Sequence, residues 1–277
     1  MSNKINILIA FPYLKKEEIK FLKEHEDHIN ILVDSGAFTA WKKGLNISVD
    51  DYATFIKKLP FKPWGYFTLD VIGDAKKSLQ NYKELKKLNL KPVPIFTRGE
   101  ELEVLEWYYS QSDYVSIGGL VGTKGNRGFV NGIMKHVNGR KVHWLGFTNQ
   151  DYLQHYKPYS CDSSSWAGGM MYGNLKLYDS GGKFHVINRK TLMNKPSERV
   201  IWLLQNVYNC DPNRLKNPGE WVNKLGKSAL RELSFKSSVR YQADVTQKTG
   251  VNYFLAIANV GDLKSTMETY KDLKGNL

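Results

Sequence analysis

Short apolar runs alternate with longer amphipathic stretches through the first part of the chain. The runs are rich in Ile, Val, Leu and aromatic residues and end at polar or glycine residues, which is the pattern of buried strands. They predict strands at residues 5–13, 31–33, 64–69, 92–96, 114–117, 142–145 and 159–161. The stretches between them predict helices at residues 15–28, 48–59, 74–88 and 100–109, with Ser48 and Asp74 as N-caps.

Strands that alternate with helices predict parallel pairing, because each helix carries the chain back to the same end of the sheet. Seven such strands, with residues 250–257 as an eighth, favour an α/β fold of the closed (β/α)8 barrel type. The alternative is an open doubly wound sheet, but no Gly-x-Gly-x-x-Gly follows the first strand, so a nucleotide cofactor has little support.

We therefore predict one barrel domain over residues 1–277, with an insertion at about 172–245 between the seventh and eighth strands. The insertion is expected to contain a small hairpin around residues 184–187. Helical segments are expected around residues 199–208 and 220–233.

Charged residues and glycines stand where the predicted strands end. These strand ends supply Asp34, Asp70, Arg98, Gly118, Gly119 and Asp162. In barrel enzymes the active site lies at the C-terminal ends of the strands, so three carboxylates should converge there beside glycines that let a ligand approach the backbone. Taken alone, each Asp is more often a cap of a helix or turn. Asp34 and Asp162 both end an apolar strand and precede a serine, and this recurrence favours a site.

Carboxylates that converge on a sugar can divide a glycosyl transfer between them. One attacks the anomeric carbon and forms a covalent glycosyl-enzyme, while another moves a proton as one base leaves and its replacement arrives. A third would recognise adjacent N–H donors on a guanine edge, because an ionised carboxylate only accepts hydrogen bonds. The aromatic residues Phe38, Phe147 and Trp166 lie just beyond the strand ends, where a flat ring could be held.

Composition adds a strong positive charge to this picture. The net charge is +13, which favours a polyanionic partner. Between Lys183 and Lys248 there are 13 Lys or Arg against 5 Asp or Glu, a net of +8, so the excess lies in the C-terminal third. A solvated helix face is the alternative explanation. The candidate nucleic-acid-binding residues are Lys183, Arg189, Lys190, Arg231, Lys236 and Arg240.

Apolar runs are too short, and cysteines too few, for several classes of protein. No run reaches the roughly 18 residues of a membrane span, so no membrane partner is expected. The N-terminus lacks the pattern of a signal peptide. Cys161 and Cys210 cannot form a disulfide framework or an all-cysteine zinc site, and they fit a reducing compartment. We expect a cytoplasmic protein (in the host cytoplasm if a phage encodes it) with no metal and no cofactor.

Four segments of the chain resemble the tRNA-guanine transglycosylases. Residues 34–38, Asp-Ser-Gly-Ala-Phe, resemble the Asp-Ser-Gly-Gly-Phe signature, and residues 116–122 resemble the Gly-Gly-Leu stretch at the same strand position. Residues 142–146, followed by Cys-Asp-Ser-Ser-Ser-Trp at 161–166, resemble the segment with the nucleophilic Asp, most of all its archaeal form, Phe-Asp-Ser-Ala-Ser-Tyr. The segments occur in the family's order over about residues 30–170.

The resemblance implies a (β/α)8 barrel that exchanges guanine for a 7-deazaguanine in a polynucleotide. By position it implies that Asp162 is the nucleophile on the anomeric carbon and Asp34 the general acid/base. Asp70 would read the guanine edge and Phe38 would stack on the ring. The implied substrate-binding residues are Ser35, Phe38, Asp70, Arg98, Gly118, Gly119 and Trp166.

Two departures from the family bear on the substrate. Thr97-Arg98-Gly99 stands where the family has a Gln-Gly pair, which leaves the contact to the base oxygen to Arg98. The tRNA enzymes also carry a Cys-x-Cys-x-x-Cys…His zinc site, which two distant cysteines cannot form. This loss and the short chain suit the phage-type relatives that insert 7-deazaguanine derivatives into DNA and so protect it from restriction. We therefore favour DNA, single-stranded or with its target base flipped out, and a free 7-deazaguanine base as substrates.

Three other interpretations stay open. The first is an RNA-modifying transglycosylase that lacks the zinc subdomain. The second is a barrel that has lost its chemistry and binds nucleic acid as an accessory subunit. The third is a glycoside hydrolase with paired carboxylates, which would not need a net charge of +13. A homo-oligomer is compatible with all of them.

Overall fold

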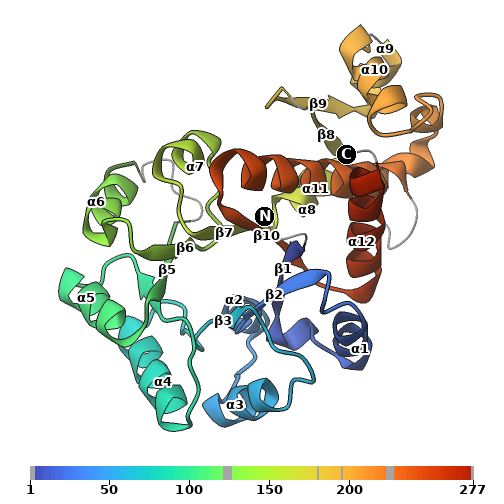
Figure 1. The fold of residues 1–277 in the computed structure, drawn as a ribbon. Coiled ribbons are helices and arrows are strands. Elements are labelled where there is room, and N and C mark those ends of the chain that lie inside the picture. Colours follow the sequence, from blue (N-terminus) through green and yellow to red (C-terminus); the bar gives the residue numbers. More distant parts are fainter. Residues whose placement is uncertain (1–3, 121–126, 180, 195, 223–227, 276–277) are drawn as a thin grey trace. The chain divides into compact units, whose positions relative to one another are not determined.

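The computed structural model of the protein describes residues 4–120, 127–179, 181–194, 196–222 and 228–275 (Figure 1). The chain divides into two compact units. Unit 1 comprises Met1–Ser163 and Thr249–Val260, and unit 2 comprises Ser164–Lys248 and Gly261–Leu277. The segment expected as an insertion between the seventh and eighth strands thus belongs to unit 2, which begins earlier and also takes the C-terminal helix.

Unit 1 is built on an eight-stranded sheet in which every pairing is parallel. Its strands are β1 (Ile5–Ala10), β2 (Ile29–Asp34), β3 (Gly65–Tyr66), β4 (Ile95–Thr97), β5 (Tyr114–Gly118), β6 (Lys141–Trp144), β7 (Ser160–Ser163) and β10 (Asn252–Ile257). They lie in the order β3-β2-β1-β10-β7-β6-β5-β4. This curled, all-parallel α/β sheet confirms the predicted fold class at that level, and the eighth strand is the one expected near the C-terminus (Figure 1).

β3 and β4 are the first and last strands in this order. A residue that follows β3 pairs with a residue that precedes β4. Phe67 and Val93 form an isolated parallel bridge. The Thr68 amide donates to the Val93 carbonyl at 2.9 Å, and the Val93 amide donates to the Tyr66 carbonyl at 2.8 Å. The segment that follows β3 and the segment that precedes β4 are therefore joined by these two hydrogen bonds.

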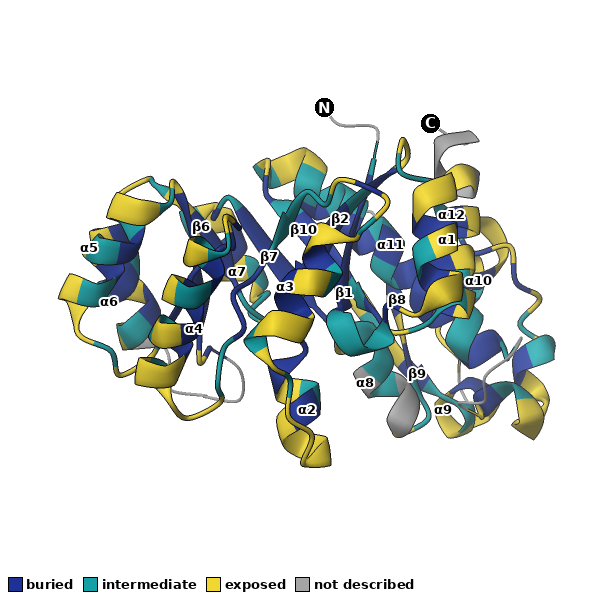
Figure 2. Cartoon of the chain, turned by 90° about the horizontal axis from the view of Figure 1, so that it is seen from below, coloured by how far each residue is buried: buried dark blue, intermediate teal, exposed yellow. Residues whose placement is uncertain are grey.

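Apolar side chains on both faces explain why the strands are continuous hydrophobic runs. All six residues of β1 are buried, and so are all five of β5. In Figure 2, β1 is dark blue, while parts of helices such as α3 and α5 are yellow. Strands covered on both faces lose the simple alternation of apolar and polar positions, as parallel sheets commonly do.

Helices lie outside the sheet of unit 1 (Figure 1). They are α1 (Lys16–Glu24), α2 (Ala37–Lys43), α3 (Val49–Lys57), α4 (Ala75–Lys87), α5 (Leu102–Gln111), α6 (Arg127–Val137) and α7 (Gln150–Tyr156), with a 3-10 turn at Phe11–Tyr13. Ser48 and Asp74 are the N-caps of α3 and α4, since their side chains accept hydrogen bonds from the amides of Asp51 and Lys77. Both cap predictions are confirmed.

Unit 2 combines a two-stranded antiparallel hairpin with helices. The hairpin pairs β8 (Asn174–Tyr178) with β9 (Phe184–Asn188), as the sequence predicts. The helices are α8 (Ser165–Met171), α9 (Arg189–Asn194), α10 (Glu198–Asn206), α11 (Ala229–Thr249) and α12 (Val260–Gly275). The helix expected over residues 220–233 is wrong in its bounds. A 3-10 turn occupies Pro218–Trp221, where a proline favours a tight first turn, and α11 begins at Ala229.

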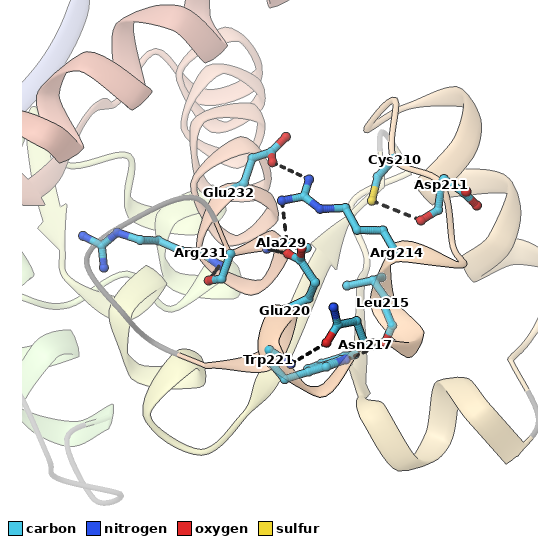
Figure 3. A network of polar contacts seen from close by, with 12 residues as sticks. Cys210, Asp211, Arg214, Leu215, Asn217, Glu220, Trp221, Ala229, Arg231 and Glu232 are labelled. Carbon is cyan, nitrogen blue, oxygen red and sulfur yellow. Dashed lines mark hydrogen bonds and ion pairs between the residues drawn. The ribbon is translucent and has the colours of Figure 1, made fainter.

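Polar contacts tie the turns that precede α11 to the helix itself (Figure 3). Arg214 forms ion pairs with Glu232 at 2.7 Å and with Glu220 at 3.1 Å. Glu220 in turn accepts a hydrogen bond from the amide of Ala229, in the first turn of α11, at 2.6 Å. An acceptor is favourable there because the first amides of a helix have no partner within it.

The described part of the chain contains no helix with the length and apolar character that crossing a membrane requires.

Candidate active site

Asp34 is the last residue of β2 and is held by a tight turn. Gly36 has a left-handed backbone, with φ of +78°, and its amide donates to Asp34 Oδ2 at 3.1 Å. A Cβ atom at Gly36 would overlap the ring of Pro12, so both the conformation and the space require glycine. The Asp-Ser-Gly sequence thus fixes the carboxylate at the C-terminal end of its strand.

Ser35 connects this carboxylate to the next strand of the sheet. The Ser35 side chain is fully buried, and its Oγ donates to Asp70 Oδ1 at 2.8 Å. The same oxygen accepts a hydrogen bond from the amide of Ala37 at 3.2 Å. Ser35 therefore orients Asp70, which follows β3, and leaves the second oxygen of Asp70 for other contacts.

The charges of Asp70 and Asp162 act on Asp34. The pKa of Asp34 is raised from 3.8 to about 7, mainly by burial and also by these two negative charges, against the lowering effect of the Gly36 and Ser35 amides. Burial also raises the pKa of Asp70, although the hydrogen bond from Ser35 opposes the shift. Asp70 and Asp162 therefore lie near enough to Asp34 for their charges to act on it.

Asp162 lies in β7 and is held through one oxygen. Its Oδ1 accepts hydrogen bonds from the Gly146 amide at 2.8 Å and from His143 Nε2 at 3.1 Å. Its Oδ2 accepts none from the described residues, and 11% of the side chain is exposed. The arrangement fixes one oxygen and leaves the other available to a ligand.

Behind Asp162 a chain of buried hydrogen bonds crosses three strands. His143 of β6 is completely buried, and its Nδ1 lies 2.7 Å from Ser160 Oγ. Ser160 Oγ lies 2.5 Å from the hydroxyl of Tyr114 in β5. His143 of β6 pairs with Ser160 of β7, and Ser160 and Asp162 share one face of β7. The strand register therefore places these side chains next to one another.

The direction of this chain follows from donor and acceptor chemistry. An ionised Asp162 only accepts, so His143 Nε2 carries a hydrogen and, in the neutral ring, Nδ1 accepts from Ser160. Ser160 then accepts from Tyr114, and burial, which raises the pKa of Tyr114, keeps that phenol protonated. His143 was missed from the sequence because a single histidine in an apolar strand is usually a packing residue. The feature that could have identified His143 is the layer of polar side chains that it forms with Ser160 and Asp162 across neighbouring strands.

Gly118 and Gly119 end β5, and Arg98 follows β4 beside them. Gly119 has φ of +72°, and a Cβ atom there would lie 3.0 Å from that of Arg98. Arg98 is exposed, and its guanidinium lies 5.4 Å from the centre of the Phe129 ring. The close approach of the two strand ends therefore depends on glycine, and Arg98 lies at the surface.

Phe38 lies in α2, one turn after Asp34, and is 53% exposed. Its ring stacks on Trp41 with centroids 6.0 Å apart, and Lys42 Nζ lies 4.3 Å from its centre. Phe147, in contrast, packs against Trp144 and Tyr152. The exposed aromatic surface of unit 1 at this end thus comes from α2, which the sequence pattern did not predict as a helix.

Trp166 belongs to unit 2. Its ring packs against Phe235 of α11, with centroids 4.1 Å apart, and Arg231 lies over both rings. Arg231 also forms an ion pair with Asp262, so its charge is used within the unit. For both residues the observed contacts are packing contacts of unit 2.

The other candidate nucleic-acid-binding residues differ in how available they are. Lys236 forms an ion pair with Glu232 at 2.8 Å, and Arg240 donates to the Val207 carbonyl at 2.8 Å. Arg189 donates to the Lys216 carbonyl at 3.4 Å. Lys183 and Lys190 are exposed. Only part of the predicted basic set therefore presents an exposed charge.

Both cysteines are free and buried. Within the described ranges no three or more His, Cys, Asp or Glu side chains are grouped so as to hold a metal ion.

No protein-family model, curated protein or solved structure matches the chain.

Proposed function

We propose that the chain is a transglycosylase that exchanges guanine in DNA for a 7-deazaguanine through a covalent intermediate on Asp162. One observation carries the proposal. Asp34, with a pKa of about 7, is close enough to feel the charge of Asp162, whose Oδ1 is held by two donors while Oδ2 accepts no hydrogen bond from the described residues. A proton carrier and a positioned nucleophile are the two groups that base exchange requires.

We further infer that the curled sheet closes into a (β/α)8 barrel. The bridge between Phe67 and Val93 supports closure, because it joins the segments at the two ends of the strand order. In a barrel the ends of β2, β3 and β7 face one common opening, which suits a site assembled from Asp34, Asp70 and Asp162.

In the first step Asp162 Oδ2 forms a bond to C1′ of the target nucleotide while the bond from C1′ to guanine N9 breaks. The bonding electron pair moves to N9, and protonated Asp34 gives its proton to the leaving base, so guanine departs neutral. A carboxyl group with a pKa of about 7 is protonated in a large fraction of molecules at neutral pH, which suits this role.

The second step reverses these movements with a new base. The Asp34 carboxylate takes the proton from N9 of the incoming 7-deazaguanine, and N9 forms a bond to C1′. The ester bond between C1′ and Asp162 breaks, and its electron pair returns to the carboxylate. Both side chains regain their starting states, and no oxidant, reductant or metal takes part.

Recognition of the base falls to Asp70 and Arg98 in this proposal. Asp70, oriented by Ser35, would accept hydrogen bonds from the N–H groups of the guanine edge. Arg98, exposed beside Gly119, would donate to the oxygen of the base. DNA is favoured over tRNA because two separate, buried cysteines provide no cysteine zinc site, and the net charge of +13 suits either polymer.

A base-exchange assay tests the proposal. Radiolabelled guanine would be offered with single-stranded DNA, duplex DNA and unmodified tRNA, using wild-type protein and Asp162→Asn. Asp50→Asn is a matched control, because Asp50 is an exposed carboxylate in the first turn of α3. Label that enters DNA with wild-type and Asp50→Asn but not with Asp162→Asn supports the proposal. Label in tRNA alone overturns the choice of polymer, and binding without any label favours an accessory nucleic-acid-binding protein.

A further inference from the structure

A pocket of about 350 Å³ in unit 1 is lined in part by Asp70. Its walls come from α2, the start of α3, the segment after β3 and one face of α4. Its lining includes Trp41, Leu45, Asp70, Lys77 and Asn81. Asp70 is among the residues that line it, whereas Asp34 and Asp162 are not.

Asn81, which lines the pocket, has a side-chain acceptor without a partner among the described residues. The residue is only 3% exposed, and its Nδ2 donates to the Leu69 carbonyl at 2.8 Å. Its Oδ1 is buried and accepts no hydrogen bond from the described part of the chain. Buried polar atoms are nearly always paired, so this oxygen calls for a donor that the protein itself does not supply. Asp70, on another wall, also only accepts when ionised.

Trp41 gives the pocket an aromatic wall. Its side chain is 60% exposed, and the neighbouring Phe38 is 53% exposed. Leu45, which also lines the pocket, is 59% exposed. Large exposed aromatic residues beside a hollow are the usual stacking platforms of proteins that bind single strands, because every base has a flat face.

Lysines surround this aromatic wall. Lys77 lines the pocket and is exposed, and Lys42 and Lys43 form the last turn of α2. Lys42 lies over Phe38, and Lys43 Nζ lies 5.7 Å from the centre of the Tyr13 ring. These features suit a nucleotide. The aromatic wall and the hydrogen-bond acceptors suit its base, and the lysines outside suit its phosphate.

We propose that this pocket binds the nucleobase next to the exchanged guanine in the same strand. The base stacks on Trp41, its N–H groups meet Asn81 Oδ1, and its phosphate lies near Lys42 and Lys77. The inference rests on the proposed function in one respect. Asp70 lines the pocket and is hydrogen-bonded to Ser35, the neighbour of Asp34, so a strand that presents guanine to Asp34 and Asp162 would pass the pocket with an adjacent nucleotide.

The test uses binding rather than exchange. Dye-labelled pentanucleotides with a central guanine would be titrated with full-length protein by fluorescence anisotropy, in deoxy and ribo forms. In one oligonucleotide the 5′ neighbour of the guanine is abasic, and in another the 3′ neighbour is abasic. The proteins are wild type, Trp41→Leu and the control Leu102→Ala, an exposed apolar residue of α5.

Loss of one neighbouring base should weaken wild-type binding about tenfold, since stacking of a base contributes about 1–3 kcal/mol. Trp41→Leu should weaken binding of the intact strand by a similar factor and should cause almost no further loss when that neighbour is abasic. Leu102→Ala should bind every strand as wild type does. Deoxy and ribo strands that behave alike would show that the pocket reads the base rather than the sugar.

The proposal is overturned if Trp41→Leu weakens binding by the same factor for the intact strand and for both abasic strands. Failure of every oligonucleotide to bind overturns it as well. The outcome is separable from that of the exchange assay. If the effect of Trp41→Leu depends on one neighbouring base but no base exchange occurs, the role of the pocket stands and the proposed function is rejected. If exchange occurs without that dependence, only the role of the pocket is rejected.

Discussion

Carboxylates with low or partial exposure occur in both units, and their pKa values are shifted in opposite directions. In unit 2, burial tends to raise the pKa of Asp179, but hydrogen bonds from His185 and the Lys183 amide, with Arg199 nearby, outweigh it and lower the pKa. In unit 1, no Lys or Arg among the described residues forms an ion pair with Asp34 or Asp70, and the pKa of each is raised.

The difference separates two uses of the same group. A carboxylate beside cations contributes to the stability of the fold, as Glu232 does between Arg214 and Lys236. A carboxylate that is buried next to other carboxylates costs stability when it is charged, and such perturbed groups concentrate at functional sites. This comparison favours the carboxylates of unit 1 for the proposed function.

Asp162→Asn should reduce base exchange by about 10⁴-fold or more, as removal of a nucleophile does in other covalent enzymes. The amide still accepts hydrogen bonds from His143 and Gly146 through its oxygen, so the fold should persist. Initial rates of label incorporation and the thermal unfolding midpoint would be measured together. Exchange within tenfold of wild type would contradict the assignment of Asp162.

His143→Phe should lower kcat by about 100-fold with little change in KM, because a nucleophile that is misplaced by about 1 Å can cost that much. The ring keeps its packing against Phe67 but loses the donor to Asp162 Oδ1. His143→Gln retains an N–H donor and should recover most of kcat. Equal losses in the two variants, at equal thermal stability, would mean that His143 acts only through packing.

Asp34→Asn should abolish exchange and yet stabilise the protein. The folded pKa is raised from 3.8 to about 7, so the folded state holds a proton that the unfolded state releases, and stability falls as pH rises from about 4 to 7. One pKa unit corresponds to about 1.4 kcal/mol; because the side chain is partly exposed, we expect a gain of roughly 2 kcal/mol at pH 8. Urea unfolding at pH 4 and pH 8 checks this, and a gain that is equal at both would contradict the raised pKa.

Asp179→Asn should have the opposite effect. Its folded pKa is lowered, so the charged form contributes stability above about pH 4, the range of an unfolded Asp, and loses it as pH falls through the folded pKa. Loss of a hydrogen-bonded charge at this buried position should cost about 1.5 kcal/mol at pH 7. The same urea experiment measures it. A stabilised Asp179→Asn would erase the contrast between the units.

The parts of the site that lie in single strands were predictable from the sequence. Asp34 and Asp162 follow apolar runs, and parallel strands place their C-terminal ends together. His143 was not predictable alone, because its role depends on the register of β6 against β7. Helix α2 was also missed: it has seven residues, begins directly after a strand-end turn and exposes Phe38 and Trp41.

The basic residues of unit 2 show what a charge count cannot reveal. Arg231 pairs with Asp262, which is 31 positions away, whereas Lys236 pairs with Glu232 one helical turn before it. Only the fold shows that the charge of Arg231 is already paired. Lys77 of α4 lines the pocket to which Asp70 also contributes. A count of lysine and arginine therefore does not show which of the charges are already paired.

The measurement that tests the central claim most directly is intact-protein mass spectrometry of a trapped intermediate. Wild-type protein would be mixed with a guanine-containing single strand, quenched in acid and compared with Asp162→Asn and Asp50→Asn. We predict an adduct of the strand minus guanine on wild type and Asp50→Asn, localised to the peptide that contains Asp162, and none on Asp162→Asn. Base exchange without an adduct on any protein, or an adduct that persists in Asp162→Asn, would contradict the account.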